Sequence, residues 1–179
     1  MCTRVFWIGP VVEGCLFIML KSNEEIIAMY RRISKKMQNA SLMNRLRTLF
    51  NRRQTLQELL EWTHSRVKFN KGSIKRHEDP IDIIEYGQGK CREFSILFTA
   101  LCLANSYKAR LILDMSDHAW TEVWSDDSGK WIHVDPSEKK MNDPEMYERD
   151  WKKDLKEVYA FDNGVIEDVT KSYKRSKVN

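Results

Sequence analysis

The sequence has few of the residues that mark disulfide-rich or zinc-stapled proteins. Its four cysteines are Cys2, Cys15, Cys91 and Cys102, and none of them forms a CxxC pair. We therefore expect no disulfide framework, no structural metal and no other cofactor. A chain with free thiols fits a reducing compartment, so the sequence predicts a cytoplasmic protein.

Unbroken apolar runs are also scarce. Residues 5–20 are largely apolar but contain Gly9, Pro10, Glu13 and Gly14. This segment is too short and too interrupted for a membrane span, so no membrane partner is expected. Residues 1–23 are interpreted as an apolar leader, either flexible or loosely packed, with a signal peptide as the alternative.

The charge balance gives only a mild signal, with a net charge of +4. Residues 26–57 carry eight lysines or arginines and no acidic residue. Such a stretch could attract nucleic acid or an acidic partner, but no nucleic-acid motif accompanies it. We interpret it as a solvated helix surface and expect no nucleic-acid partner; the oligomeric state is left open.

Hydrophobic periodicity predicts an α+β fold with helices first and an antiparallel sheet afterwards. Apolar residues recur at three-to-four spacing through residues 24–68, which indicates helices, and residues 94–104 are almost wholly apolar, which indicates a buried helix. Alternation predicts a strand pair at 118–124 and 131–135 and a second pair at 157–161 and 165–169. At this length and with 42% hydrophobic residues, one domain is expected.

Three residues occur in the chain order of a cysteine hydrolase: Cys91, His118 and Asp135. Cys91 follows a glycine-containing turn, in the first turn of the predicted buried helix, where free backbone amides and the helix dipole favour a thiolate. An imidazole can take the thiol proton, and a carboxylate behind it fixes the tautomer of the ring. The pattern predicts a catalytic triad.

The two strands that carry His118 and Asp135 are joined by hairpin chemistry at residues 125–129. If residues 125–128 form the loop, His118 lies directly opposite Asp135. Opposed side chains lie roughly 5 Å apart, within reach of a hydrogen bond.

The stretches around these residues resemble one known family. GKCREF, SDHAWTEVW, KWIHVDPSE and VYAFDNGVIEDVTKSY are similar to the catalytic core of peptide:N-glycanase, a member of the transglutaminase-like superfamily. The resemblance covers about half the chain. It implies residues 24–179 as one transglutaminase-like, papain-like domain, in which 24–68 form a helical part and 81–173 the catalytic core.

The resemblance also implies a function. Cys91, His118 and Asp135 fall on the catalytic positions, and the family hydrolyses the amide between asparagine and N-acetylglucosamine in glycopeptides or denatured glycoproteins, through a thioester. Four further residues fall on positions that line the family's glycan cleft: Trp120, Glu122, Trp131 and Glu138. Indoles suit the apolar face of a sugar and carboxylates accept its hydrogen bonds, although both tryptophans could instead be core aromatics.

The sequence departs from the family at Arg92, where a small residue is usual and where a cation could stabilise the thiolate or narrow the cleft. Two other functions stay open. The chain could be a cysteine protease or amidase that acts on substrates without glycans, or a non-catalytic binding module that works through its basic N-terminal helices.

Overall fold

Three capped helices open the part of the chain that the computed structural model describes, residues 22–174. They are α1 (Asn23–Lys36), α2 (Ala40–Arg47) and α3 (Leu56–Arg66). Ser22 and Thr55 accept hydrogen bonds from the third residue of α1 and α3, and glutamates reach back to them, so both helices begin with capping boxes. The helices predicted within 24–68 are confirmed. The predicted leader lies outside the described residues, except that its last two residues cap and begin α1.

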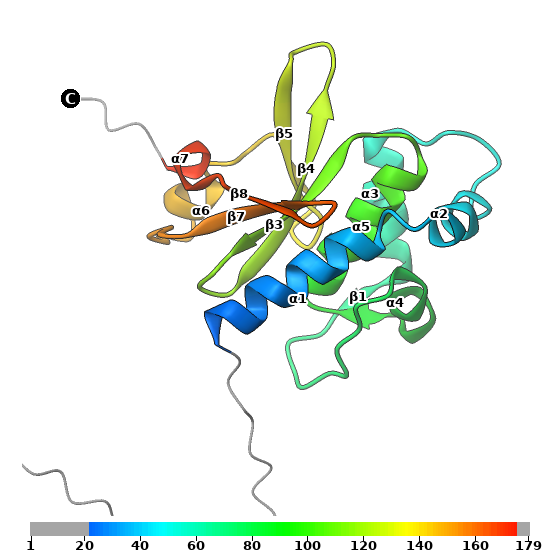
Figure 1. Cartoon of the computed structure of the whole chain (residues 1–179), viewed down its shortest axis with the longest axis horizontal. Helices are drawn as coiled ribbons and strands as arrows, with labels where there is room; N and C mark the ends of the chain where they lie inside the picture. Colours follow the sequence, from blue (N-terminus) through cyan, green and yellow to red (C-terminus); the bar gives the residue numbers. More distant parts are fainter. Residues whose placement is uncertain (1–21, 175–179) are drawn as a thin grey trace, which may run out of the picture.

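Six antiparallel strands form the main sheet, in the order β6-β5-β4-β3-β7-β8 (Figure 1). Their bounds are β3 Ala109–Asp114, β4 His118–Ser125, β5 Lys130–Asp135, β6 Lys140–Met141, β7 Val158–Asp162 and β8 Val165–Asp168. Side-chain alternation predicts the β4–β5 and β7–β8 hairpins but not β3, which lies between them and joins them into one sheet.

The predicted buried helix is α5 (Cys91–Ala104), which packs on one face of this sheet. It is preceded by α4 (Pro80–Tyr86) and by a short parallel pair, β1 (Lys68–Phe69) with β2 (Gln88–Gly89). Gly87 ends α4 in the left-handed conformation, with φ of 68°. A Cβ on Gly89 would lie 2.7 Å from the Cβ of Glu93, so only glycine lets β2 approach the first turn of α5.

The sheet separates two hydrophobic clusters. The larger one contains the apolar face of α5 together with Ala119 and Val123 of β4. The smaller one lies on the opposite face and includes Trp120 and Tyr147. It is covered by α6 (Met146–Arg149) and α7 (Thr170–Tyr173), which Figure 1 shows on the side away from α2, α3 and α4. Side-chain alternation along β4 therefore follows the predicted pattern.

The register of the β4–β5 hairpin differs from the predicted one. Thr121 pairs with Val134 and Ser125 with Lys130, so the loop is residues 126–129 rather than 125–128. Gly129 causes the difference, because its φ of 61° suits the last position of the loop and not the first residue of a strand. The shift of two residues keeps every side chain on its predicted face. It changes the opposed pair, however, since continuing the register sets Asp135 across from Trp120 and diagonal to His118.

The β7–β8 hairpin is attached to the first helix. Arg31 Nε donates to Gly164 O at 2.8 Å, and Gly164 N donates to Ser34 Oγ at 3.0 Å. Segments about 130 residues apart in the sequence therefore lie side by side, as Figure 1 shows for α1 and β7. Within residues 22–174, no helix has both the length and the apolar character that a bilayer span requires.

Candidate active site

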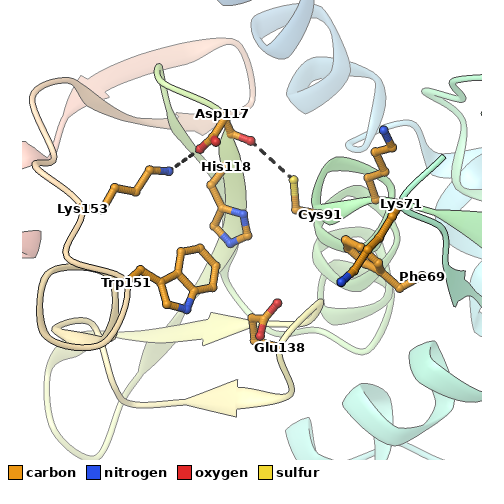
Figure 2. Close-up of a pocket in the computed structure, with 9 residues that line it drawn as sticks. Phe69, Lys71, Cys91, Asp117, His118, Glu138, Trp151 and Lys153 are labelled. Carbon is orange, nitrogen blue, oxygen red and sulfur yellow. Dashed lines mark hydrogen bonds and ion pairs between the residues drawn. The ribbon is translucent and has the colours of Figure 1, made fainter. Parts of the chain in front are cut away.

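A cleft of about 580 Å³ lies between the start of α5 and the start of β4. Figure 2 shows His118 and Trp151 on one side of it, and Cys91, Phe69 and Lys71 on the other. The residues that line the cleft are Phe69, Lys71, Lys90, Cys91, Asp117, His118, Glu138, Trp151 and Lys153. The cysteine and the histidine of the predicted triad thus open onto one space.

Cys91 is the first residue of α5 and is half-buried. The turn before it is fixed by Glu93, which is fully buried and accepts a hydrogen bond from Lys90 N at 3.1 Å. Glu93 also forms an ion pair with Arg76 at 2.8 Å. The nucleophile candidate is therefore held by a rigid helix start, as predicted.

Arg92 points away from the cleft. Its guanidinium pairs with Glu93 at 3.0 Å and approaches the sulfur of Met29 at 3.5 Å. The side chain is mostly buried and is not part of the cleft wall. Of the two possible roles of Arg92, these contacts argue against narrowing of the cleft, and stabilisation of a thiolate stays a prediction.

Cys91 and His118 approach each other at the start of β4. Cys91 Sγ lies 3.8 Å from Asp117 O, the carbonyl directly before His118 (Figure 2). On its other side, His118 Nε2 lies 2.6 Å from Asp135 Oδ2. Burial lowers the pKa of His118, but the hydrogen bond to Asp135 and the interaction with Cys91 outweigh it and raise the pKa to about 9. A protonated ring between two acids is the form this arrangement favours.

Asp135 is fully buried, and both of its oxygens accept hydrogen bonds. Oδ2 faces His118, and Oδ1 accepts from the backbone amides of Ser137 and Glu138 and from Ser137 Oγ. Burial raises the pKa of this carboxyl, and the bond to His118 and the other donors more than reverse that effect, so the pKa lies below its usual value. Asp135 is an anion that keeps His118 in one orientation.

Of the four residues predicted to contact the substrate, only Glu138 lines the cleft. This residue is exposed. Trp120 is fully buried in the smaller hydrophobic cluster, where its Nε1 donates to Tyr173 Oη at 2.7 Å. Trp120 thus occupies the position of a core aromatic, the alternative to substrate contact that the sequence left open.

Glu122 and Trp131 lie outside the cleft as well. Glu122 accepts hydrogen bonds from Arg110 Nε at 2.6 Å and from Tyr173 Oη at 2.7 Å. The guanidinium carbon of Arg110 also lies over the Trp131 ring, 4.0 Å from the ring centre. Both line a separate cavity of about 340 Å³ on the face of the sheet that is opposite α5.

Two aromatic residues of the cleft were not identified from the sequence. Trp151 is 41% exposed, and its ring stands edge-on to that of His118 at 4.9 Å. Phe69 is exposed on the opposite wall. The sequence predicts Trp151 only as a residue that docks a charged surface segment, and Phe69 lies in a two-residue strand, so no sequence signal connects either of them with Cys91. In residues 22–174, no group of three or more His, Cys, Asp or Glu side chains is arranged to hold a metal.

The fold and the cleft agree with the relatives of this chain. A family model of the transglutaminase-like superfamily matches residues 40–136, so the chain belongs to that superfamily. A second model, the Rad4 transglutaminase-like domain, matches residues 115–179. The resemblance to peptide:N-glycanase is confirmed, because curated proteins named peptide-N(4)-(N-acetyl-beta-glucosaminyl)asparagine amidase are homologous to about half of this chain.

The relative from Arabidopsis thaliana is 40% identical over 100 residues, which are 56% of this chain and 14% of the relative. The one from Oryza sativa subsp. japonica is 43% identical over 95 residues, 53% of this chain and 21% of the relative. The one from Gallus gallus is 36% identical over 121 residues, 64% of this chain and 19% of the relative. The chain thus spans a small part of the length of these proteins.

A solved structure supports the fold alone. A chain in the crystal structure of Rad4-Rad23 bound to a 6-4 photoproduct UV lesion superimposes with a TM-score of 0.64 at 17% identity. The match covers 83% of this chain and 46% of that one. The predicted α+β, transglutaminase-like architecture is confirmed.

Proposed function

We propose that this chain is a cysteine-dependent amide hydrolase of the peptide:N-glycanase type, which releases N-linked glycans from glycopeptides or denatured glycoproteins. The observation that carries the proposal is that Cys91 and His118 line one open cleft, and that buried Asp135 bonds His118 from the other side. The similarity of about half the chain to named glycanases supports the choice of substrate.

The proposed reaction is acyl transfer through Cys91. The Cys91 thiolate attacks the carbonyl carbon of the glycosylated asparagine side chain, and the carbon–nitrogen bond then breaks. His118 gives its proton to the departing nitrogen, which leaves as a glycosylamine, while the acyl group stays on sulfur as a thioester. Water then attacks the thioester and gives a proton to His118. The carbon–sulfur bond breaks, which leaves aspartate in the peptide and restores the Cys91 thiolate.

Two structural features support this chemistry. The ring of His118, with its pKa raised to about 9, holds at neutral pH the proton that the leaving nitrogen needs. The backbone amide of Cys91 lies in the first turn of α5, where helix geometry leaves it free to stabilise the oxyanion.

Substrate contact is proposed for the residues that line the cleft. The exposed indole of Trp151 offers an apolar platform for a sugar ring next to His118, and Glu138 can accept hydrogen bonds from sugar hydroxyls or amides. For Trp120, Glu122 and Trp131 we propose a supporting role beneath the sheet, because their polar atoms and rings are engaged with Arg110 and Tyr173.

Mass spectrometry of a denatured N-glycoprotein tests the proposal. The wild-type chain should convert the glycosylated asparagine to aspartate and release an intact glycan. Cys91→Ala should abolish the conversion, whereas Cys102→Ala, which alters the buried free thiol of the same helix, should keep it. Main-chain cleavage instead would indicate a protease, and release of ammonia from a glutamine peptide would indicate a simple amidase.

Iodoacetamide labelling at pH 6 separates an enzyme from a binding module. A thiol partnered by His118 should react much faster than Cys102, because burial raises the pKa of the Cys102 thiol well above its ordinary value. Equally slow labelling of both cysteines would favour the non-catalytic module. Since Cys91 must stay reduced to act, we also propose that the chain works in a reducing compartment, the cytoplasm.

A further inference from the structure

The Asp135 oxygen that faces His118 has a second side-chain partner. Tyr147 Oη lies 3.0 Å from Asp135 Oδ2, the same oxygen that His118 contacts. Behind the tyrosine, His133 Nε2 lies 2.7 Å from Tyr147 Oη. All four side chains are buried, so a continuous chain of hydrogen bonds runs from the cleft into the smaller hydrophobic cluster.

The chemistry of the groups fixes the direction of each bond. A carboxylate only accepts, so Tyr147 must give its single hydroxyl proton to Asp135. The hydroxyl can then only accept from His133, which requires a proton on His133 Nε2 and leaves Nδ1 with a lone pair. His133 Nδ1 is indeed buried and has no hydrogen-bond partner within residues 22–174.

We infer that Tyr147 is a positioning residue of the active site, which holds the Asp135 carboxylate toward His118 and is itself oriented by His133. The inference rests on the proposed function in so far as Cys91 is the nucleophile. It extends the site to α6, an element of four residues that carries Tyr147 across the smaller cluster to the back of the triad.

The hydroxyl, rather than the ring, carries this role. The Tyr147 ring already packs on Trp120 at 4.5 Å between centroids, and a phenylalanine ring would fill the same space. Burial, and then the charge of Asp135, raise the pKa of Tyr147 well above its ordinary value, so the hydroxyl keeps the proton that it donates. Burial lowers the pKa of His133 to about 4, so this ring is neutral at physiological pH. The other charged groups that act on these side chains are His118, Glu138 and Asp143.

Tyr173 provides a matched control. It is a buried tyrosine of the same cluster, and its hydroxyl donates to Glu122 instead of Asp135. Tyr147→Phe and Tyr173→Phe thus remove the same atom from the same environment, and only the first variant removes a donor from the triad.

The experiment measures the rate of iodoacetamide labelling at Cys91 against pH, together with kcat and KM on a glycopeptide. The labelling rate of Cys91 falls at low pH, and we call this part of the profile the acid limb. Without the Tyr147 donor the Asp135 carboxylate is protonated more readily and supports the charged His118 ring less. The acid limb should therefore move up by about one pH unit. We expect kcat to fall about tenfold, the value of one hydrogen bond to a charged group, with KM unchanged. Tyr173→Phe should keep the acid limb and kcat of the wild type.

Acid limbs that coincide for Tyr147→Phe and the wild type would overturn the inference, and so would equal shifts in both tyrosine variants. Labelling needs no glycan, so a shift of the acid limb confined to Tyr147→Phe supports the inference whatever the substrate is. Failure of the wild type to cleave glycopeptides would reject only the proposed function. If Tyr147→Phe does not fold, as judged by circular dichroism, His133→Leu replaces it. Loss of the hydrogen bond from His133 weakens Tyr147 as a donor, so we expect a smaller upward shift of the acid limb. An acid limb at the wild-type pH would overturn the inference.

Discussion

Ser95 and Ala119 connect the two halves of the active site. Ser95 Oγ lies 2.8 Å from Ala119 O on β4 and 2.8 Å from Cys91 O one turn earlier in α5. Ala119 directly follows His118, so one buried hydroxyl connects the helix turn of the proposed nucleophile with the strand that carries its proposed base. The distance between Cys91 and His118 depends on this link between helix and strand.

We expect Ser95→Ala to lower activity more than its cost in stability explains. Removing the hydroxyl leaves the Ala119 carbonyl buried without this donor, which should lower the free energy of unfolding by about 1–3 kcal/mol. The control is Thr99→Val, one turn further along α5, which breaks the 2.8 Å bond to Thr121 between the same helix and strand. Urea unfolding should show similar losses, and only Ser95→Ala should reduce kcat. Equal activities would mean that the link does not set the geometry of the site.

Gly89→Ala should damage both the fold and the site. The added Cβ would meet Glu93 Cβ at 2.7 Å and Val67 Cγ1 at 3.1 Å, which pushes β2 away from the start of α5. An overpacked contact of this kind costs about 1–3 kcal/mol, and it displaces the turn that carries Cys91. Thermal unfolding and Cys91 labelling measure the two effects. Gly129→Ala, where a Cβ meets nothing within 4 Å, should cost only the strain of its positive φ and leave labelling unchanged.

Activity should fall as the pH rises through about 9. The pKa of His118 is raised from 6.5 to about 9, so the ring loses the proton for the leaving group only above that pH. Because the folded pKa is raised, the ring also contributes stability that is fully present below pH 6.5 and is lost as the pH rises through about 9. A pH–rate profile and melting curves of wild type and His118→Gln test both statements. An alkaline limb near 6.5 would show that neither Asp135 nor Cys91 acts on the ring.

Trp120 and Trp151 should respond to substitution in opposite ways. Trp120 is fully buried, so Trp120→Ala should lower the free energy of unfolding by about 3–5 kcal/mol. Trp151→Ala removes an exposed ring, and the change in stability should stay within about 0.5 kcal/mol while KM for a glycopeptide rises. Chemical denaturation and glycopeptide kinetics on the same preparations make the comparison. An unchanged KM for Trp151→Ala would remove that residue from the proposed substrate wall.

The sequence alone was sufficient for the parts of the site that depend on local patterns. The glycine turn before an apolar run predicted that Cys91 begins a buried helix, and the structure places it there. Alternation predicted the faces of β4 and β5 correctly, because a face depends only on whether a position is odd or even. The register was off by two residues, because the turn residues alone did not reveal that Gly129 closes the loop.

The roles of particular side chains depended on contacts between distant segments. Trp120 shares a strand face with His118, but α6 and α7 cover that face and remove the indole from solvent. Arg92 turns to Glu93 and Met29, and nothing in the local sequence indicates that Met29 lies there. Trp151 reaches His118 through an irregular segment, where periodicity carries no information.

The position of β7 next to β3 has a consequence for synthesis on the ribosome. All three residues of the proposed triad have been added to the chain by position 135, yet β3 gains its second neighbour only when residues 158–162 follow. A nascent or truncated chain that stops before Val158 leaves the central strand with an open hydrogen-bonding edge, which invites pairing with other chains. It also lacks the hairpin that attaches to α1 through Gly164. Chains that end between residues 136 and 157 should therefore aggregate rather than fold into a shortened form of this domain.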